Sequence, residues 1–174
     1  MKNNRGITLI ELIVVIAIIS ILSLGTALSV GLLGYGNAKS ATGRIVTGLD
    51  SVRLENMTKK EQYYLVVYQK DKDYYLSIQT VKDSGRIITK EEKLDLKKGK
   101  ISFKDTDGIH YHISSDVAEG NVKDELVVTF AKDTGGLMGN SLGDGEVIKT
   151  IYVECNRMEY IIHLVEATGK YYVD

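Results

Sequence analysis

The chain of 174 residues has no proline, no tryptophan and only one cysteine. A single thiol, Cys155, excludes an internal disulfide. Without proline, any bend in the apolar N-terminal segment would have to rest on Gly25 or on later glycines. The net charge is −1, from 22 basic and 23 acidic residues, so nothing in the overall charge attracts nucleic acid or acidic lipid.

A long uncharged segment lies near the N-terminus. From Leu12 to Ala38 there is no charged side chain, a stretch of 27 residues. As a helix it would measure about 40 Å, and a bilayer core needs roughly 20 apolar residues. Lys2 and Arg5 precede it, and the positive-inside rule therefore places the N-terminus in the cytoplasm. The pattern predicts a transmembrane helix with the rest of the chain exported.

The residues Gly6-Ile7-Thr8-Leu9-Ile10-Glu11 join a short basic leader to this segment. They resemble the class III signal of type IV prepilins and pseudopilins. The resemblance implies that a membrane-embedded aspartyl peptidase cleaves between Gly6 and Ile7 and then methylates the amine of Ile7. Members usually have phenylalanine as the first mature residue, and Ile7 departs from that pattern.

Glu11 is the one carboxylate at the edge of the apolar segment. A charge in a bilayer is costly, about 2.5–3.5 kcal/mol at the centre. The resemblance implies an assembly role, in which Glu11 pairs with the new amine of Ile7 on a neighbouring subunit. Two other interpretations remain: a carboxylate that reaches the membrane surface from an ordinary anchor, and a secretory signal peptide cleaved after Gly25-Thr26-Ala27.

After residue 36 the sequence predicts an amphipathic helix followed by a β-rich domain. Apolar residues recur at helical spacing at Ala38, Ala41, Ile45, Leu49 and Val52. From Tyr63 the period becomes two, and a four-residue turn, Lys70–Asp73, is expected to join two strands in a hairpin. Further strands are predicted at 86–89, 100–103, 109–113, 126–131, 147–154, 158–165 and 170–173. The glycine-rich segment 133–146 is predicted to be a loop.

The expected fold class is α+β: a long hydrophobic N-terminal helix, the spine, packed against a C-terminal antiparallel β-sheet head. The predicted divisions are a leader at 1–6, a transmembrane or filament-core helix at 7–36, an amphipathic outer half at 37–62, and a globular head at 63–174. The segment Tyr160–Leu164 and the sequence Thr168-Gly169-Lys170 resemble the end of minor pseudopilins of the GspH/FimT type. Those proteins pack the helix against two antiparallel sheets.

For the other candidate sites, the sequence favours structural roles. Asp105-Thr106-Asp107-Gly108 begins like a calcium loop, but the closing position, where such loops have glutamate, is Asp116, so a turn is the better interpretation. His110 and His112 would share one face of a strand, yet no cysteine or carboxylate cluster accompanies them. Tyrosine is common in half-exposed strands, so the 11 tyrosines are expected to pack in the core and at the edges of the sheet. No nucleophile–base pair, phosphate loop or carboxylate dyad is present, and neither enzymatic activity, nor a cofactor, nor a metal is expected.

The sequence therefore predicts a minor pilin or pseudopilin of a type IV pilus, type II secretion or competence filament. Its expected partners are a prepilin peptidase, other pilin or pseudopilin subunits, the inner-membrane assembly platform and, before assembly, the lipid bilayer. It would be a single-pass membrane protein with an exported head, and later part of an extracellular or periplasmic filament. The alternative is a membrane-anchored or secreted β domain with no filament role.

Overall fold

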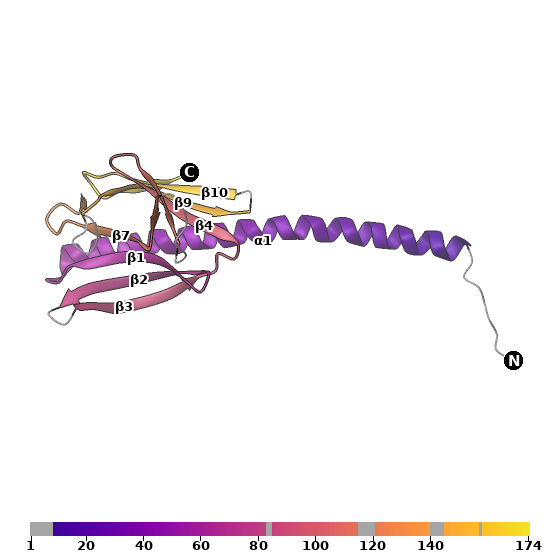
Figure 1. The fold of residues 1–174 in the computed structure, drawn as a ribbon, viewed down its shortest axis with the longest axis horizontal. Coiled ribbons are helices and arrows are strands. Elements are labelled where there is room, and N and C mark those ends of the chain that lie inside the picture. The colour runs from indigo at the N-terminus through magenta and orange to yellow at the C-terminus, as the bar shows by residue number, and fades with distance from the viewer. Residues whose placement is uncertain (1–8, 83–84, 115–120, 140–144, 157) are drawn as a thin grey trace.

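The computed structural model describes residues 9–82, 85–114, 121–139, 145–156 and 158–174, with the backbone alone for 22–35. Within these ranges there is one helix, α1, which runs from Leu9 to Thr58. Its N-terminal part extends away from the β strands, and its C-terminal part lies along them (Figure 1). The helix continues through Gly25 and the later glycines without interruption, because a glycine weakens a helix by only about 1 kcal/mol.

The C-terminal half of α1 packs on the head through one apolar face. The residues that form this face are at most 1% exposed, and we call them the buried stripe: Ala38, Ala41, Ile45, Leu49 and Val52. They join a single core with side chains from both sheets, including Leu65 and Phe103. The helical spacing of the stripe therefore correctly predicted which face is buried.

The described strands form two sheets. The first has the order β3-β2-β1-β7-β8. Its strands are β1 (Tyr63–Lys70), β2 (Asp73–Lys82), β3 (Gly85–Leu94), β7 (Glu125–Phe130) and β8 (Leu137–Met138). The second has the order β11-β10-β9-β4-β5-β6. Its strands are β4 (Gly99–Asp105), β5 (His110–Ile113), β6 (Val122–Lys123), β9 (Ile148–Cys155), β10 (Met158–Leu164) and β11 (Tyr171–Val173).

Three expectations about the head need correction. The head is antiparallel as expected except for the pair β5–β6, which is parallel, and its described strands form two sheets. The turn between β1 and β2 has two residues instead of four, since Lys70 pairs with Asp73. Asp71 and Lys72 both have positive φ angles, 52° and 66°, which is the geometry of the tight turn whose twist suits a two-residue hairpin. The segment 133–146 contains β8, which is too short to leave a periodic signal.

Strand β1 also departs from simple alternation, because Tyr63–Val67 are all buried. On the side of the first sheet away from α1, a second small cluster forms from Tyr64, Val66 and Val127. Arg86 on β3 forms an ion pair of 2.7 Å with Glu125 on β7 across this side. Two strands lie between β3 and β7, so the sheet must curl toward this face, which explains the burial of the second cluster.

Candidate functional site

The predicted cleavage and methylation site, Gly6 and Ile7, lies outside the described residues. Glu11 lies in the first turn of α1 and is exposed. A carboxylate at this position is favourable for the helix itself, because the unsatisfied N–H groups of the first turn carry partial positive charge. The structure therefore places Glu11 at the start of the projecting part of the helix.

The projecting part of α1 has an apolar surface on every side. The large apolar residues from Leu9 to Ile21 are each at least 51% exposed. A continuous apolar surface of this kind marks a site of contact with protein or lipid. In the part of the chain that the structure describes, no helical segment is both long enough and apolar enough to cross a membrane.

Polar contacts fix the angle at which α1 enters the head. Arg44 donates a hydrogen bond of 3.2 Å to the carbonyl of Lys93 and lies 3.6 Å and 3.7 Å from the carboxylates of Glu92 and Asp95. At Gly48, one turn further along α1, the helix lies so close to β1 that an added Cβ would be only 2.7 Å from the Leu65 side chain. The head and the C-terminal half of the helix thus form one packed unit, while residues 9–21 remain outside it.

The segment Asp105–Gly108 is a turn between β4 and β5. Asp105 is 2% exposed, and its Oδ1 accepts a hydrogen bond of 2.9 Å from the backbone N–H of Ile109. Gly108 has a φ of +81°, a conformation that glycine adopts readily. The carboxylate that would open a calcium loop is therefore occupied in closing the turn. Within the described residues, no group of three or more histidine, cysteine, aspartate or glutamate side chains could hold a metal ion.

All three histidines of the chain lie on one face of the second sheet. The rings of His110 and His112 stack with centroids 5.1 Å apart, and His110 also stacks on Tyr152 at 5.0 Å. Nε2 of His110 lies 2.8 Å from Oγ of Ser102. Burial lowers the pKa of His110, and the neighbouring charge of His112 lowers it further. These contacts use the imidazoles in packing between neighbouring strands.

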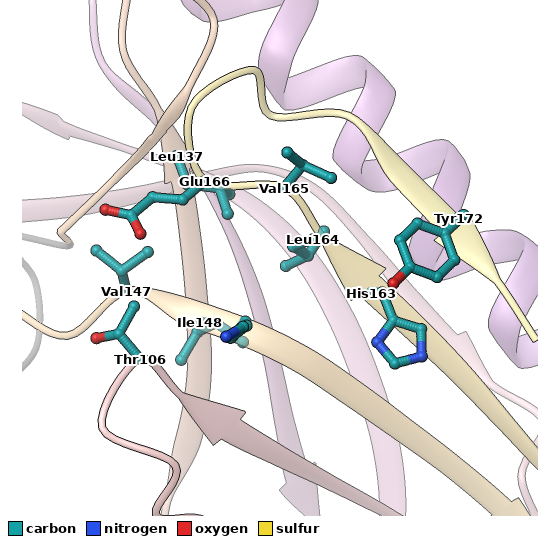
Figure 2. A pocket seen from close by; sticks show the side chains of 10 residues that line it. Thr106, Leu137, Val147, Ile148, His163, Leu164, Val165, Glu166 and Tyr172 are labelled. Atoms are coloured by element: carbon teal, nitrogen blue, oxygen red, sulfur yellow. The ribbon is translucent and has the colours of Figure 1, made fainter.

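His163 lies on β10, separately from the other pair, and stacks on Tyr172 of β11 with ring centroids 4.6 Å apart. Its Nε2 lies 3.3 Å from a carboxylate oxygen of Asp174. Both aromatic rings border a pocket of about 390 Å³ (Figure 2). The sequence did not predict this pocket, because its lining residues come from separate elements. Its only sequence signal was the glycine-rich segment 133–146, which contributes Leu137.

The described residues thus contain two distinct features: a projecting apolar helix and a folded head with a lined pocket.

The family described as the prokaryotic N-terminal methylation motif matches residues 1–27. Comparison with curated proteins gives no match, and comparison with solved structures gives none. The matched residues include Gly6, Ile7 and Glu11. The chain therefore carries a prepilin-type N-terminal signal, of the kind found in type IV pilins and pseudopilins.

Proposed function

We propose that the chain is a minor pilin or pseudopilin that is cleaved between Gly6 and Ile7, methylated at Ile7 and assembled into a filament. The observation that carries this proposal is the methylation motif at residues 1–27. The filament would belong to a type IV pilus, a type II secretion system or a competence machine.

The two halves of α1 support this assignment. The C-terminal half is amphipathic and its stripe is buried in the head. The described residues of the N-terminal half, by contrast, expose apolar side chains that the head does not cover. Such a surface is stable only when lipid or other protein covers it. A subunit that waits in a bilayer and then packs its helix among those of its neighbours satisfies that requirement in both states.

Glu11 has a specific part in the proposed assembly. After cleavage, the amine of Ile7 on a neighbouring subunit would supply the positive charge that compensates the carboxylate. In a surrounding of low dielectric constant, an unpaired charge is strongly disfavoured. The pairing would therefore fix the axial register of one helix against the next.

The proposal assigns no catalytic role and no cofactor to the chain. Its partners would be the prepilin peptidase, other pilin or pseudopilin subunits, and the inner-membrane assembly platform. The precursor would be held in the cell membrane with the N-terminus in the cytoplasm and the head exported. After assembly it would be part of a filament outside that membrane.

The test is intact-mass analysis of the chain produced with a prepilin peptidase. We expect wild type to lose residues 1–6 and to gain one methyl group. Gly6→Val should retain the leader, because a branched side chain would occupy the space that glycine leaves for the peptidase. Loss of the leader from Gly6→Val would contradict the proposal. Cleavage near residue 27 would instead support the secreted β domain.

A further inference from the structure

The pocket of about 390 Å³ lies where the edge of the first sheet meets the end of the second, and we call it the seam pocket. Backbone hydrogen bonds close the seam around it. The N–H of Leu137 on β8 donates to the carbonyl of Glu166, beyond β10, at 2.8 Å, and the N–H of Thr106 donates to the carbonyl of Val147 at 3.1 Å. Because these bonds join ordered segments, the pocket is formed before any ligand arrives, as is usual for binding sites of this volume.

Aliphatic side chains form much of the pocket lining. Leu137, Val147, Leu164 and Val165 approach it from three segments of the chain (Figure 2). Val165 is 40% exposed, although the neighbouring Leu164 is buried. Covering such a surface with an apolar group is favourable in proportion to the area removed from water. The lining therefore favours a ligand with an apolar side chain.

Two opposite charges also line the seam pocket: Lys149 and Glu166. Both are exposed. Within the described part of the chain, neither side chain is joined to a partner by an ion pair or a hydrogen bond. Some charged side chains of the head are paired across its strands, as Arg86 is with Glu125 and Lys93 with Asp73. The uncompensated pair at the pocket is complementary to a ligand that carries one charge of each sign.

The remaining side of the pocket is aromatic. Tyr172 stacks on His163, and His163 is held by Asp174. Tyr172 is 54% exposed, so much of this side chain remains accessible. A stacked and anchored ring is a rigid contact surface that loses little conformational entropy when a ligand binds.

We propose that the seam pocket binds a short peptide in which an apolar side chain lies between a basic and an acidic residue. The basic group would pair with Glu166, the acidic group with Lys149, and the apolar side chain would cover Leu137 and Val165. A saccharide fits less well, because hydroxyl groups facing the aliphatic lining would lose hydrogen bonds to water without replacement. A simple anion would be repelled by Glu166. The proposal is independent of leader processing.

The test uses the tripeptide acetyl-Lys-Trp-Glu-amide and the full chain in detergent. The protein has no tryptophan, so the fluorescence anisotropy of the indole reports on the peptide alone. We expect saturable binding, with a dissociation constant on the order of 1 mM or tighter. The neutral peptide acetyl-Gln-Trp-Gln-amide should bind at least about tenfold more weakly, because two ion pairs are lost. Empty detergent micelles provide the background for both peptides.

Four variants locate the binding site. Glu166→Gln and Lys149→Gln should each weaken binding of the charged peptide about three- to tenfold. Glu159→Gln and Lys170→Gln remove charges that do not line the pocket, and should leave binding unchanged. Equal binding of the charged and neutral peptides, or no response to either pocket variant, would overturn the proposal. So would displacement of the peptide by N-acetylglucosamine at equal concentration, which would indicate a saccharide site instead.

Discussion

The side-chain amide of Asn56 binds both backbone groups of Tyr63. Its Oδ1 accepts a hydrogen bond of 2.6 Å from the Tyr63 N–H, and its Nδ2 donates one of 3.0 Å to the Tyr63 carbonyl. Nδ2 also lies 3.2 Å from Oγ1 of Thr129 on β7. Asn56 is 1% exposed and belongs to the last turn of α1, so one buried amide joins the helix to β1 and β7. This contact sets where the helix ends relative to the first sheet.

Replacing Asn56 should therefore weaken the whole head. In Asn56→Leu the N–H of Tyr63 loses its side-chain partner while it remains buried, at about 1–3 kcal/mol. The Tyr63 carbonyl loses one of two donors, since Oγ1 of Thr129 still donates to it at 2.7 Å. We expect the free energy of unfolding to fall by about 2–4 kcal/mol. Thr47→Ala, on an exposed part of the same helix, should change it by less than about 0.5 kcal/mol. Urea unfolding followed by the near-ultraviolet circular dichroism of the tyrosines measures both, and similar values for the two variants would contradict the role of Asn56.

Gly169 occupies a position that no other residue can fill without rearrangement. Its φ is +60°, and a Cβ there would lie 2.0 Å from the carbonyl oxygen of Gly135. Gly108 provides the matched control, because its φ is +81° but a Cβ would meet no atom within 4 Å. Gly108→Ala should lower the free energy of unfolding only by the backbone strain, about 1–2 kcal/mol. Gly169→Ala should lower it by at least about 2 kcal/mol more. Equal midpoints in urea would show that the backbone around Gly135 adjusts freely.

The buried stripe can be tested with two substitutions on the same helix. Ile45 is 0% exposed and Leu54 is 63% exposed. Ile45→Asp places a charge in the core without a partner, which costs several kcal/mol and approaches the total stability of a domain of this size. Leu54→Asp should have little effect, because its side chain remains in water. Thermal unfolding of the full chain in detergent should therefore show a large loss only for Ile45→Asp. A similar loss for Leu54→Asp would mean that the exposed face also contributes to the fold.

The sequence predicted the buried stripe because a helical face is defined by residues three and four positions apart, all in one local segment. The pairing of β7 with β1 has no such local signal, since the paired residues lie about 60 positions apart in the sequence. The sequence also missed the tight turn at Asp71 and Lys72, because neither is the asparagine or glycine that usually marks such a turn. Burial of Tyr64 and Val66 on the second face of β1 depends on the curl of the sheet, which no local pattern encodes.

The candidate sites show the same contrast between a signal held in one local segment and one that depends on distant segments. Gly6, Ile7 and Glu11 are neighbours in sequence and form a recognisable pattern. The seam pocket instead combines Thr106, Lys149 and Glu166 with residues from other elements, and only the completed fold places them around one cavity. The cleavage and methylation of Ile7 stay a prediction, because those residues lie outside the described part of the chain.

Tyr171 should make the stability of the head depend on pH in alkaline solution. Its hydroxyl donates a hydrogen bond of 2.8 Å to Asp50, and burial followed by this bond raises its pKa to about 12. The unfolded chain loses the same proton near pH 10. Because the folded state keeps its proton longer, the contribution of this group is fully present below pH 10 and is lost as the pH rises from about 10 to 12. Tyr171→Phe should flatten this part of a plot of unfolding free energy against pH. An unchanged slope would assign the alkaline loss to Tyr68, whose pKa burial and Glu91 also raise to about 12.

Glu11 provides the test that separates a filament subunit from an ordinary membrane anchor. Glu11→Gln keeps the size of the side chain and removes its charge, so membrane insertion should be at least as favourable and leader cleavage should continue. Without the carboxylate, the amine of Ile7 on the neighbouring helix would be buried without a partner, and we expect incorporation into filaments to fall at least about tenfold. Glu11→Asp retains the charge on a shorter side chain and should keep part of that incorporation. The measurement is the ratio of filament-bound to membrane-bound subunit in cells that carry the assembly machinery. Equal ratios for wild type and Glu11→Gln would remove the assembly role and favour the interpretation in which Glu11 simply reaches the membrane surface.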